Sequence, residues 1–282
     1  MKKTILVDSA CDLKNIENIA EGISYHRIPL KIMVGEKEFV DDETLDPLQM
    51  MDEVYAYPGK TSSACPGPED WAQYFREADE SYVITITSNL SGSYNSAMVA
   101  KEMVLEEYPD KKIYILDSLT AGAEMVLQAR KMYELVAQDT PFEEVCRIMD
   151  DYAVNHTRIV FMLYSIENLV KNGRVSRIAG MAAGLLNLHM IGRATEVGTI
   201  ESFAKARNKK KGAALALEEM EREGYQGGKV VIGNCGNPVG SEMMKEAIVA
   251  KYGDVEFEFL DLGGLCSYYA ERNGLMIGYE VN

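Results

Sequence analysis

The chain has 282 residues, of which 47% are hydrophobic, and its formal net charge is −15. This length and composition suffice for two globular domains or one large one. The negative charge argues against a protein that binds nucleic acid or an anionic membrane surface, because phosphate groups require a basic face.

The cysteines and the N-terminal sequence predict a cytoplasmic protein. The first apolar run ends at Asp8, which is too early for a signal peptide, and no run approaches the length of a transmembrane helix. Without a C-x-x-C pair, we expect free thiols in a reducing compartment. The five cysteines are scattered, at Cys11, Cys65, Cys146, Cys235 and Cys266.

Strands and helices alternate through the first half of the chain. We expect strands at 4–7, 25–33, 82–87 and 112–116, with a short hairpin over 34–40. Helices are expected at 12–20, 47–55, 69–78, 93–105, 122–138 and 141–154. Such alternation is typical of an α/β domain in which helices flank a mostly parallel sheet.

Two hydroxyl-rich segments precede helices in this half. The turn Ser91-Gly92-Ser93 follows a buried strand, so its hydroxyls and free N–H groups lie at the positive end of a helix dipole, where an anion is stabilised. A single turn of this kind is more often a helix cap. However, we also interpret residues 60–66 as a loop, and its adjacent Thr61, Ser62 and Ser63 supply more hydroxyls than one cap requires. Together the segments favour a ligand.

The pattern changes near residue 156. A strand at 158–163 and a short helix at 166–171 precede an antiparallel pair at 190–196 and 199–203, and a basic segment opens a helix over 204–223. Further strands are expected at 229–232, 255–260 and 275–280, with a helix at 241–252. We therefore divide the chain into residues 1–156 and an α/β domain of mixed or antiparallel sheet at 157–282. The small residues at 180–187 fit either tight helix packing or a pocket wall.

Motifs for catalysis, cofactors and metals are absent from the sequence. It contains no G-x-S-x-G, Walker A, H-E-x-x-H or G-x-G-x-x-G motif, and no cluster of metal-ligand residues. His26, His156 and His189 lie in unrelated contexts without a partner in sequence. We expect a binding protein without catalytic residues, cofactor or metal.

Several motifs resemble those of the DegV family of bacterial fatty-acid-binding proteins. The Thr61 loop and the Ser91–Tyr94 turn carry the strongest similarity, and the match extends over essentially the whole chain. The other matching segments are Asp8-Ser9 with Asp12-Leu13, Asp117-Ser118, 172–176 and 185–187.

This resemblance implies an N-terminal α/β domain with the carboxylate-binding loops and a smaller C-terminal domain that forms the acyl-chain pocket. The carboxylate of a long-chain fatty acid would meet hydroxyls of Thr61, Ser62 and the Ser91-Gly92-Ser93 turn. Family members present the acid to a separate ATP-dependent fatty-acid kinase. Arg174, in a Gly-Arg motif, and Arg207 are the expected contacts to that partner or its phosphate.

One family motif is changed near the C-terminus. A histidine within His-x-Gly-Pro-Gly is replaced here by the segment that begins Cys266-Ser267-Tyr268-Tyr269. We expect Ser267 to take the place of the histidine, with Tyr268 and Tyr269 as alternatives.

Two other functions stay open at this stage. The first is a binder of another small anion or phosphate through Arg174, Lys205 and Arg207. The second, which we rank lower, is an acyl hydrolase or transferase with Ser93 or Cys235 as its nucleophile.

Overall fold

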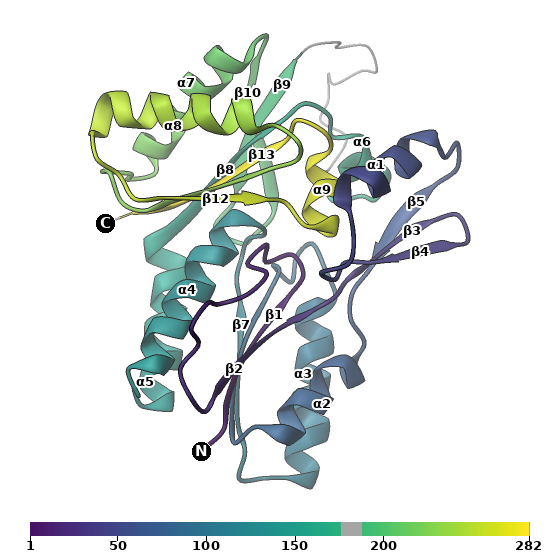
Figure 1. Cartoon of the computed structure of the whole chain (residues 1–282), viewed down its shortest axis with the longest axis vertical. Coiled ribbons are helices and arrows are strands. Elements are labelled where there is room, and N and C mark those ends of the chain that lie inside the picture. The colour runs from purple at the N-terminus through teal and green to yellow at the C-terminus, as the bar shows by residue number, and fades with distance from the viewer. Residues whose placement is uncertain (176–187, 282) are drawn as a thin grey trace.

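The computed structural model describes residues 1–175 and 188–281, and Figure 1 shows its arrangement. In this part of the chain the strands form three sheets. The first is a four-stranded sheet of order β2-β1-β6-β7, in which all neighbours are parallel. Its strands are β1 (Lys3–Asp8), β2 (Ile23–Ile28), β6 (Glu80–Thr85) and β7 (Lys112–Asp117).

Helices cover both faces of this parallel sheet (Figure 1). On one face, α2 (Pro68–Glu77) and α3 (Ser93–Glu107) enclose a core that includes Trp71 and Phe75. On the other, α4 (Ala123–Ala137) and α5 (Phe142–Asp151) bury a row of methionines and valines, and a π-helix (Tyr152–His156) follows. Burial on both faces explains why β6 is buried throughout.

The second sheet has six strands in the order β10-β9-β8-β13-β11-β12, and only β11 and β12 pair in parallel. Helices α7 (Lys209–Arg222) and α8 (Pro238–Tyr252) pack on it. Gly278 allows α4 to approach closely, because an added Cβ would lie 2.5 Å from the Glu124 nitrogen. The strands are β8 (Thr157–Leu163), β9 (His189–Ala194), β10 (Ile200–Ala206), β11 (Val230–Asn234), β12 (Phe257–Asp261) and β13 (Leu275–Glu280).

The third sheet is a small antiparallel arm that projects from the side of the molecule (Figure 1). It consists of β3 (Lys31–Val34), β4 (Lys37–Val40) and β5 (Thr61–Ala64). Helix α1 (Pro47–Ala56) and the short helix α9 (Gly264–Ala270) pack together beside it, with Tyr268 in their shared core. Helix α6 (Glu167–Lys171) contacts α9.

The structure corrects several local predictions. The hydroxyl-rich segment at Thr61 is strand β5, because it pairs with β3. The predicted strand at 25–33 is divided between β2 and β3, which belong to different sheets. No helix forms over 12–20, and β10 continues to Ala206, so that the basic helix begins only at Lys209. The small-residue segment 180–187 lies outside the described residues.

Candidate functional site

A cavity of about 320 Å³ lies where the carboxyl edge of the parallel sheet meets the six-stranded sheet and α9. Such an edge is where open α/β sheets generally bind ligands. The parallel sheet contributes the segments after β6 and β7, among them Ile86 and Ala121. The opposite wall includes Ile159 and Phe161 of β8. Most of the lining is apolar, which suits a ligand with a hydrocarbon portion.

Polar groups also border this cavity. Ser91 and Gly92 border it at the start of α3, and Ser63 borders it at the end of β5. The Ser63 hydroxyl lies 2.8 Å from the Tyr269 hydroxyl, and Tyr269 also lines the cavity. Cys65 links these two segments, because an added Cβ at Gly92 would lie 3.1 Å from its sulfur. The hydroxyls of Ser63, Ser91 and Tyr269 thus border a mostly apolar space, and the lining also includes three threonines, Thr87, Thr120 and Thr199.

Arg174 brings a positive charge to the cavity lining close to the Ser91 turn. Its guanidinium donates to the Leu90 carbonyl at 3.0 Å and to the Asn172 carbonyl at 2.6 Å, and its side chain lines the cavity. The ion pairs found among the described residues do not include Arg174. An arginine has five N–H donors, so, as far as the described residues show, Arg174 retains donors and a charge without an acidic partner beside the Ser91 turn.

The alternation of strand β5 decides where its three hydroxyls point. Successive side chains of a strand face opposite sides, so Thr61 and Ser63 share a face, and both contact α9. The buried Thr61 hydroxyl lies 2.7 Å from that of Tyr268, which also accepts from the Asn172 amide at 2.9 Å. Ser62 points to the other face. Of the three, only Ser63 is among the cavity-lining residues in the described part of the chain.

Ser93 lies directly behind the cavity wall. It is fully buried, and its hydroxyl donates to a carboxylate oxygen of Asp8 at 2.6 Å. Asp8 closes the first strand and also accepts from the amides of Ile86 at 2.9 Å and Ala10 at 3.2 Å. Burial outweighs these hydrogen bonds and raises the pKa of Asp8 to about 6. The sequence analysis named Asp8 only as part of a matching family motif and not as a site residue, although a polar side chain that ends a buried strand was the available signal.

Two other predicted site residues lie away from the cavity lining of the described chain. Ser267 is buried within α9, where its hydroxyl donates to the Leu262 carbonyl at 3.0 Å. Arg207 is exposed between β10 and α7. Their roles stay predictions, and of the three candidates for the missing histidine, Tyr269 is the one that lines the cavity.

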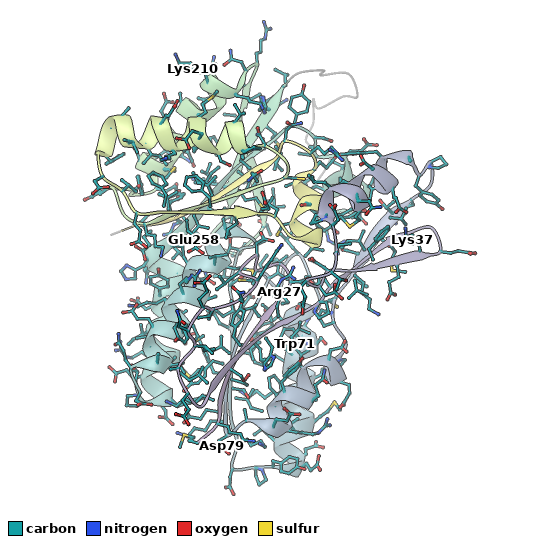
Figure 2. All side chains as sticks on the ribbon, viewed as in Figure 1. Arg27, Lys37, Trp71, Asp79, Lys210 and Glu258 are labelled. Carbon is teal, nitrogen blue, oxygen red and sulfur yellow. The ribbon has the colours of Figure 1, made fainter. Side chains whose placement is uncertain are left out.

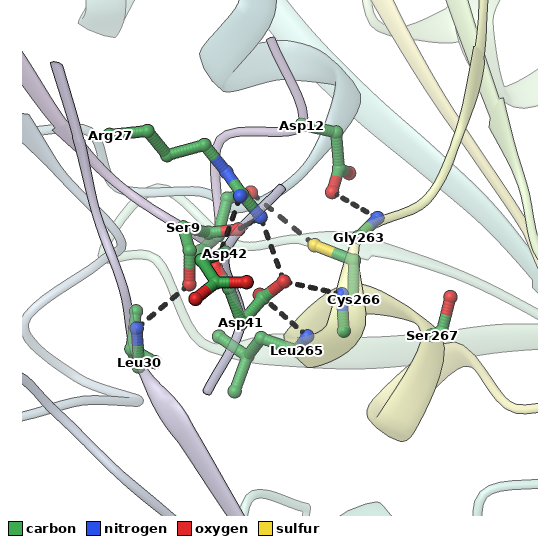
Figure 3. A network of polar contacts seen from close by, with 12 residues as sticks. Ser9, Asp12, Arg27, Leu30, Asp41, Asp42, Gly263, Leu265, Cys266 and Ser267 are labelled. Atoms are coloured by element: carbon green, nitrogen blue, oxygen red, sulfur yellow. Dashed lines mark hydrogen bonds and ion pairs between the residues drawn. The ribbon is translucent and has the colours of Figure 1, made fainter. Parts of the chain in front are cut away.

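A buried ionic network fixes α9 to the N-terminal half (Figure 3). Asp41 accepts from Arg27 at 2.8 Å and from the first two amides of the helix region, Gly264 at 2.7 Å and Leu265 at 2.9 Å. Asp12 accepts from the Gly263 amide at 2.8 Å, and burial raises its pKa to about 7. In Figure 2, Arg27 lies in the interior, whereas Lys37 and Lys210 project from the periphery.

The residues that would support other chemistry are placed unfavourably. Cys235 is buried, and burial raises the pKa of its thiol, which lowers its nucleophilicity. The cavity lining in the described part of the chain includes no histidine that could act as a base. Within the same residues, no three histidine, cysteine or acidic side chains are grouped to hold a metal ion. Among the helices described, none combines the length and apolarity needed to cross a membrane.

Comparison with known proteins places this geometry in a family. The model of the DegV family, described as uncharacterised protein, DegV family COG1307, matches residues 2–281. A DegV domain-containing protein of Streptococcus pneumoniae is 41% identical over 278 residues, which cover 99% of each chain.

Solved structures agree with that match. The fatty acid kinase (Fak) B3 protein of Streptococcus pneumoniae, loaded with linoleic acid, superposes with a TM-score of 0.96 at 40% identity, covering 100% of each chain. A DegV family protein of Eubacterium eligens, loaded with heptadecanoic acid, gives a TM-score of 0.93 at 35% identity, covering 99% of this chain and 100% of the other. The present chain belongs to the DegV family.

Proposed function

We propose that this protein binds a long-chain fatty acid in the cavity between the parallel sheet and the six-stranded sheet. The observation that carries the proposal is the composition of the cavity lining, which is mostly apolar but includes Arg174 and several hydroxyls. A fatty acid has the complementary shape, a hydrocarbon tail with one anionic end. Burial of the tail contributes roughly 0.8 kcal/mol per methylene group.

The carboxylate is held, in this proposal, at the turn before α3. Ser91 and the backbone of Gly92 face the cavity, the start of the helix favours an anion, and Arg174 supplies a positive charge. Ser93 lies behind this wall, where its hydroxyl donates to Asp8. Thr61 and Ser62 are further from the cavity than the sequence pattern implies, so Ser63, paired with Tyr269, is the hydroxyl of β5 that we assign to the ligand.

Relatives support the binding of a fatty acid. The pneumococcal protein loaded with linoleic acid is a component of a fatty acid kinase, and the protein of Eubacterium eligens holds heptadecanoic acid. By analogy, the present protein presents its bound acid to a separate ATP-dependent kinase. Residues 1–156 supply the turns that bind the carboxylate, and residues 157–282 supply much of the acyl-chain wall. Arg174 and Arg207 remain our candidates for the contact with the kinase.

Native mass spectrometry of the purified protein, followed by extraction under denaturing conditions, tests the proposal. We expect a stoichiometric adduct that releases a fatty acid. Ala194 lines the cavity at the end of β9, so the A194F variant should lose the adduct. Val197 lies on the same hairpin but is 59% exposed, so V197F is the matched control and should retain it.

Two results would contradict the proposal. One is the absence of any adduct, both after purification and after incubation with a panel of fatty acids. The other is equal retention of lipid by A194F and V197F, with circular dichroism showing that both are folded. Phosphate-bearing ligands would then be the next class to test, because Arg174 has no acidic partner among the described residues.

A further inference from the structure

The hydrogen bond between Ser93 and Asp8 affects the protonation state in which an anionic ligand can bind. This inference rests on the proposed binding of a fatty acid. The Ser93 hydroxyl has one hydrogen, and it is donated to Asp8 at 2.6 Å. Ser93 follows Ser91 and Gly92, which border the cavity, and Asp8 also accepts from the amide of Ile86, another lining residue. The Asp8 carboxyl therefore lies immediately behind the wall at which we place the ligand's carboxylate.

Two carboxylates would then face each other across a thin wall. If both were ionised, they would repel, and both would compete for the single Ser93 hydrogen. A proton on Asp8 removes both difficulties. The protonated carboxyl donates to the Ser93 oxygen, and the Ser93 hydrogen becomes free to turn toward the cavity.

We propose that Asp8 is a positioning residue that takes up one proton from solvent when the anionic carboxylate of a fatty acid binds. The proton balance is simple. The ligand enters as an anion, the aspartate becomes a neutral acid, and the net charge of the buried site is unchanged. Ligand binding is thereby coupled to pH through a residue that does not line the cavity.

The groups around Asp8 are compatible with the uptake of a proton by its carboxylate. Arg27 of β2 lowers the pKa of Asp8 without a direct hydrogen bond, and the ion pairs among residues 1–175 and 188–281 include none with Asp8. Cys11 has its pKa raised to about 12 and is neutral. Asp12, a further carboxyl of the same loop whose pKa is also raised, to about 7, accepts from the Gly263 amide and has no bond to Ser93. From α9, Cys266 donates to the Ala10 carbonyl, and burial keeps it a thiol.

The remaining neighbours of Asp8 are an ion-paired carboxylate and two uncharged donors. Asp41 is paired with Arg27, and β6 and α3 present to Asp8 the Ile86 amide and the Ser93 hydroxyl. With a pKa of about 6, free Asp8 is almost fully ionised at pH 7.5. Binding should therefore take up about one proton per ligand at that pH, and affinity should fall by up to about tenfold per pH unit above it.

Calorimetric titration of the delipidated full-length protein with linoleate tests this inference. Measurements at pH 7.5 in phosphate and in Tris, which differ in ionisation enthalpy, give the number of protons taken up. We expect about one for the wild type and none for D8N, whose amide can donate to Ser93 without titrating. E124Q is the matched control and should keep the wild-type uptake: Glu124 is also a buried carboxyl with a raised pKa, of about 7, but it bonds to Thr157.

A second measurement decides the question even if D8N does not fold. The 13C NMR shift of linoleate labelled at its carboxyl carbon should show an ionised ligand in the wild-type complex. A protonated bound ligand, or uptake that persists in D8N, overturns the inference. Binding without proton uptake overturns the inference alone, whereas failure of the wild type to bind linoleate overturns the proposed function as well.

Discussion

Replacement of Asp41 by asparagine is the sharpest test of how the two halves of the molecule are joined. Asp41 has one oxygen that accepts from Arg27 and Gly264 and a second that accepts from Leu265. Asparagine keeps only one acceptor oxygen, so its NH2 group, a donor, would face another donor, either a backbone N–H or the guanidinium. The substitution also leaves the Arg27 charge buried without its closest partner.

The structure allows the magnitude to be worked out. Removal of one member of a buried ion pair costs about 3–5 kcal/mol, because the other charge is left uncompensated. Arg27 keeps its bonds to the carbonyls of Ser9 and Cys11, and Asp12 still acts on it electrostatically. We therefore expect D41N to lower the free energy of unfolding by about 3 kcal/mol, the lower end of that range. The thermal midpoint should fall by roughly 10 °C.

Equilibrium unfolding in urea, without ligand, measures this loss. The control is E53Q, which breaks the exposed pair of Lys37 with Glu53, whose side chains are 54% and 38% exposed. Such a surface pair contributes at most about 1 kcal/mol. If D41N and E53Q lose equal stability, the network of Figure 3 does not hold the halves together and the reasoning is wrong.

Other predictions concern pH, the tyrosine pair and a glycine. Burial raises the pKa of Glu124 to about 7, so the folded state binds a proton that the unfolded chain releases near pH 4.3. The free energy of unfolding should therefore fall by roughly 2–4 kcal/mol between about pH 5 and 8. Urea titrations at each pH should show a flatter profile for E124Q. Y269F should weaken fatty-acid retention in native mass spectrometry with little change in thermal midpoint. Y268F should lower the thermal midpoint, because the Tyr268 hydroxyl is buried with two partners. The reverse pattern would contradict the assignment of Tyr269 to the ligand. G198A should destabilise the hairpin in thermal unfolding, because φ is +75° and the new Cβ would lie 2.2 Å from the Thr87 hydroxyl; an unchanged midpoint would show that the turn is not held against the sheet edge.

Sequence patterns predicted the strands and helices whose buried residues follow from neighbouring positions in the sequence. The strand at β6 follows from a run of β-branched and aromatic residues, although it ends at Thr85 and not at Thr87, and the helix that begins at Ser93 follows from a polar turn. The strand predicted at 275–280 is β13. The family and the α/β fold are likewise confirmed by the comparisons.

Elements that depend on distant partners were not predictable in this way. Thr61–Ala64 has the composition of a loop and becomes a strand only because β3 offers an edge. Asp12 suggested a helix start, yet its carboxylate accepts from Gly263, 251 residues away. Dependence on distant partners also explains why part of the site could not be predicted. The pairing of Ser93 with Asp8 joins residues 85 positions apart, and no local pattern specifies it.

The cavity draws its lining from positions between Leu30 and Met276. During synthesis, the apolar wall formed by Ile86 and Ala121 is complete long before β8, α9 and β13 have left the ribosome to cover it. A nascent chain of this protein therefore exposes the inner face of its own binding site until those later elements follow. Free fatty acid cannot template the early steps of folding, and this exposed face is the surface on which a chaperone would act.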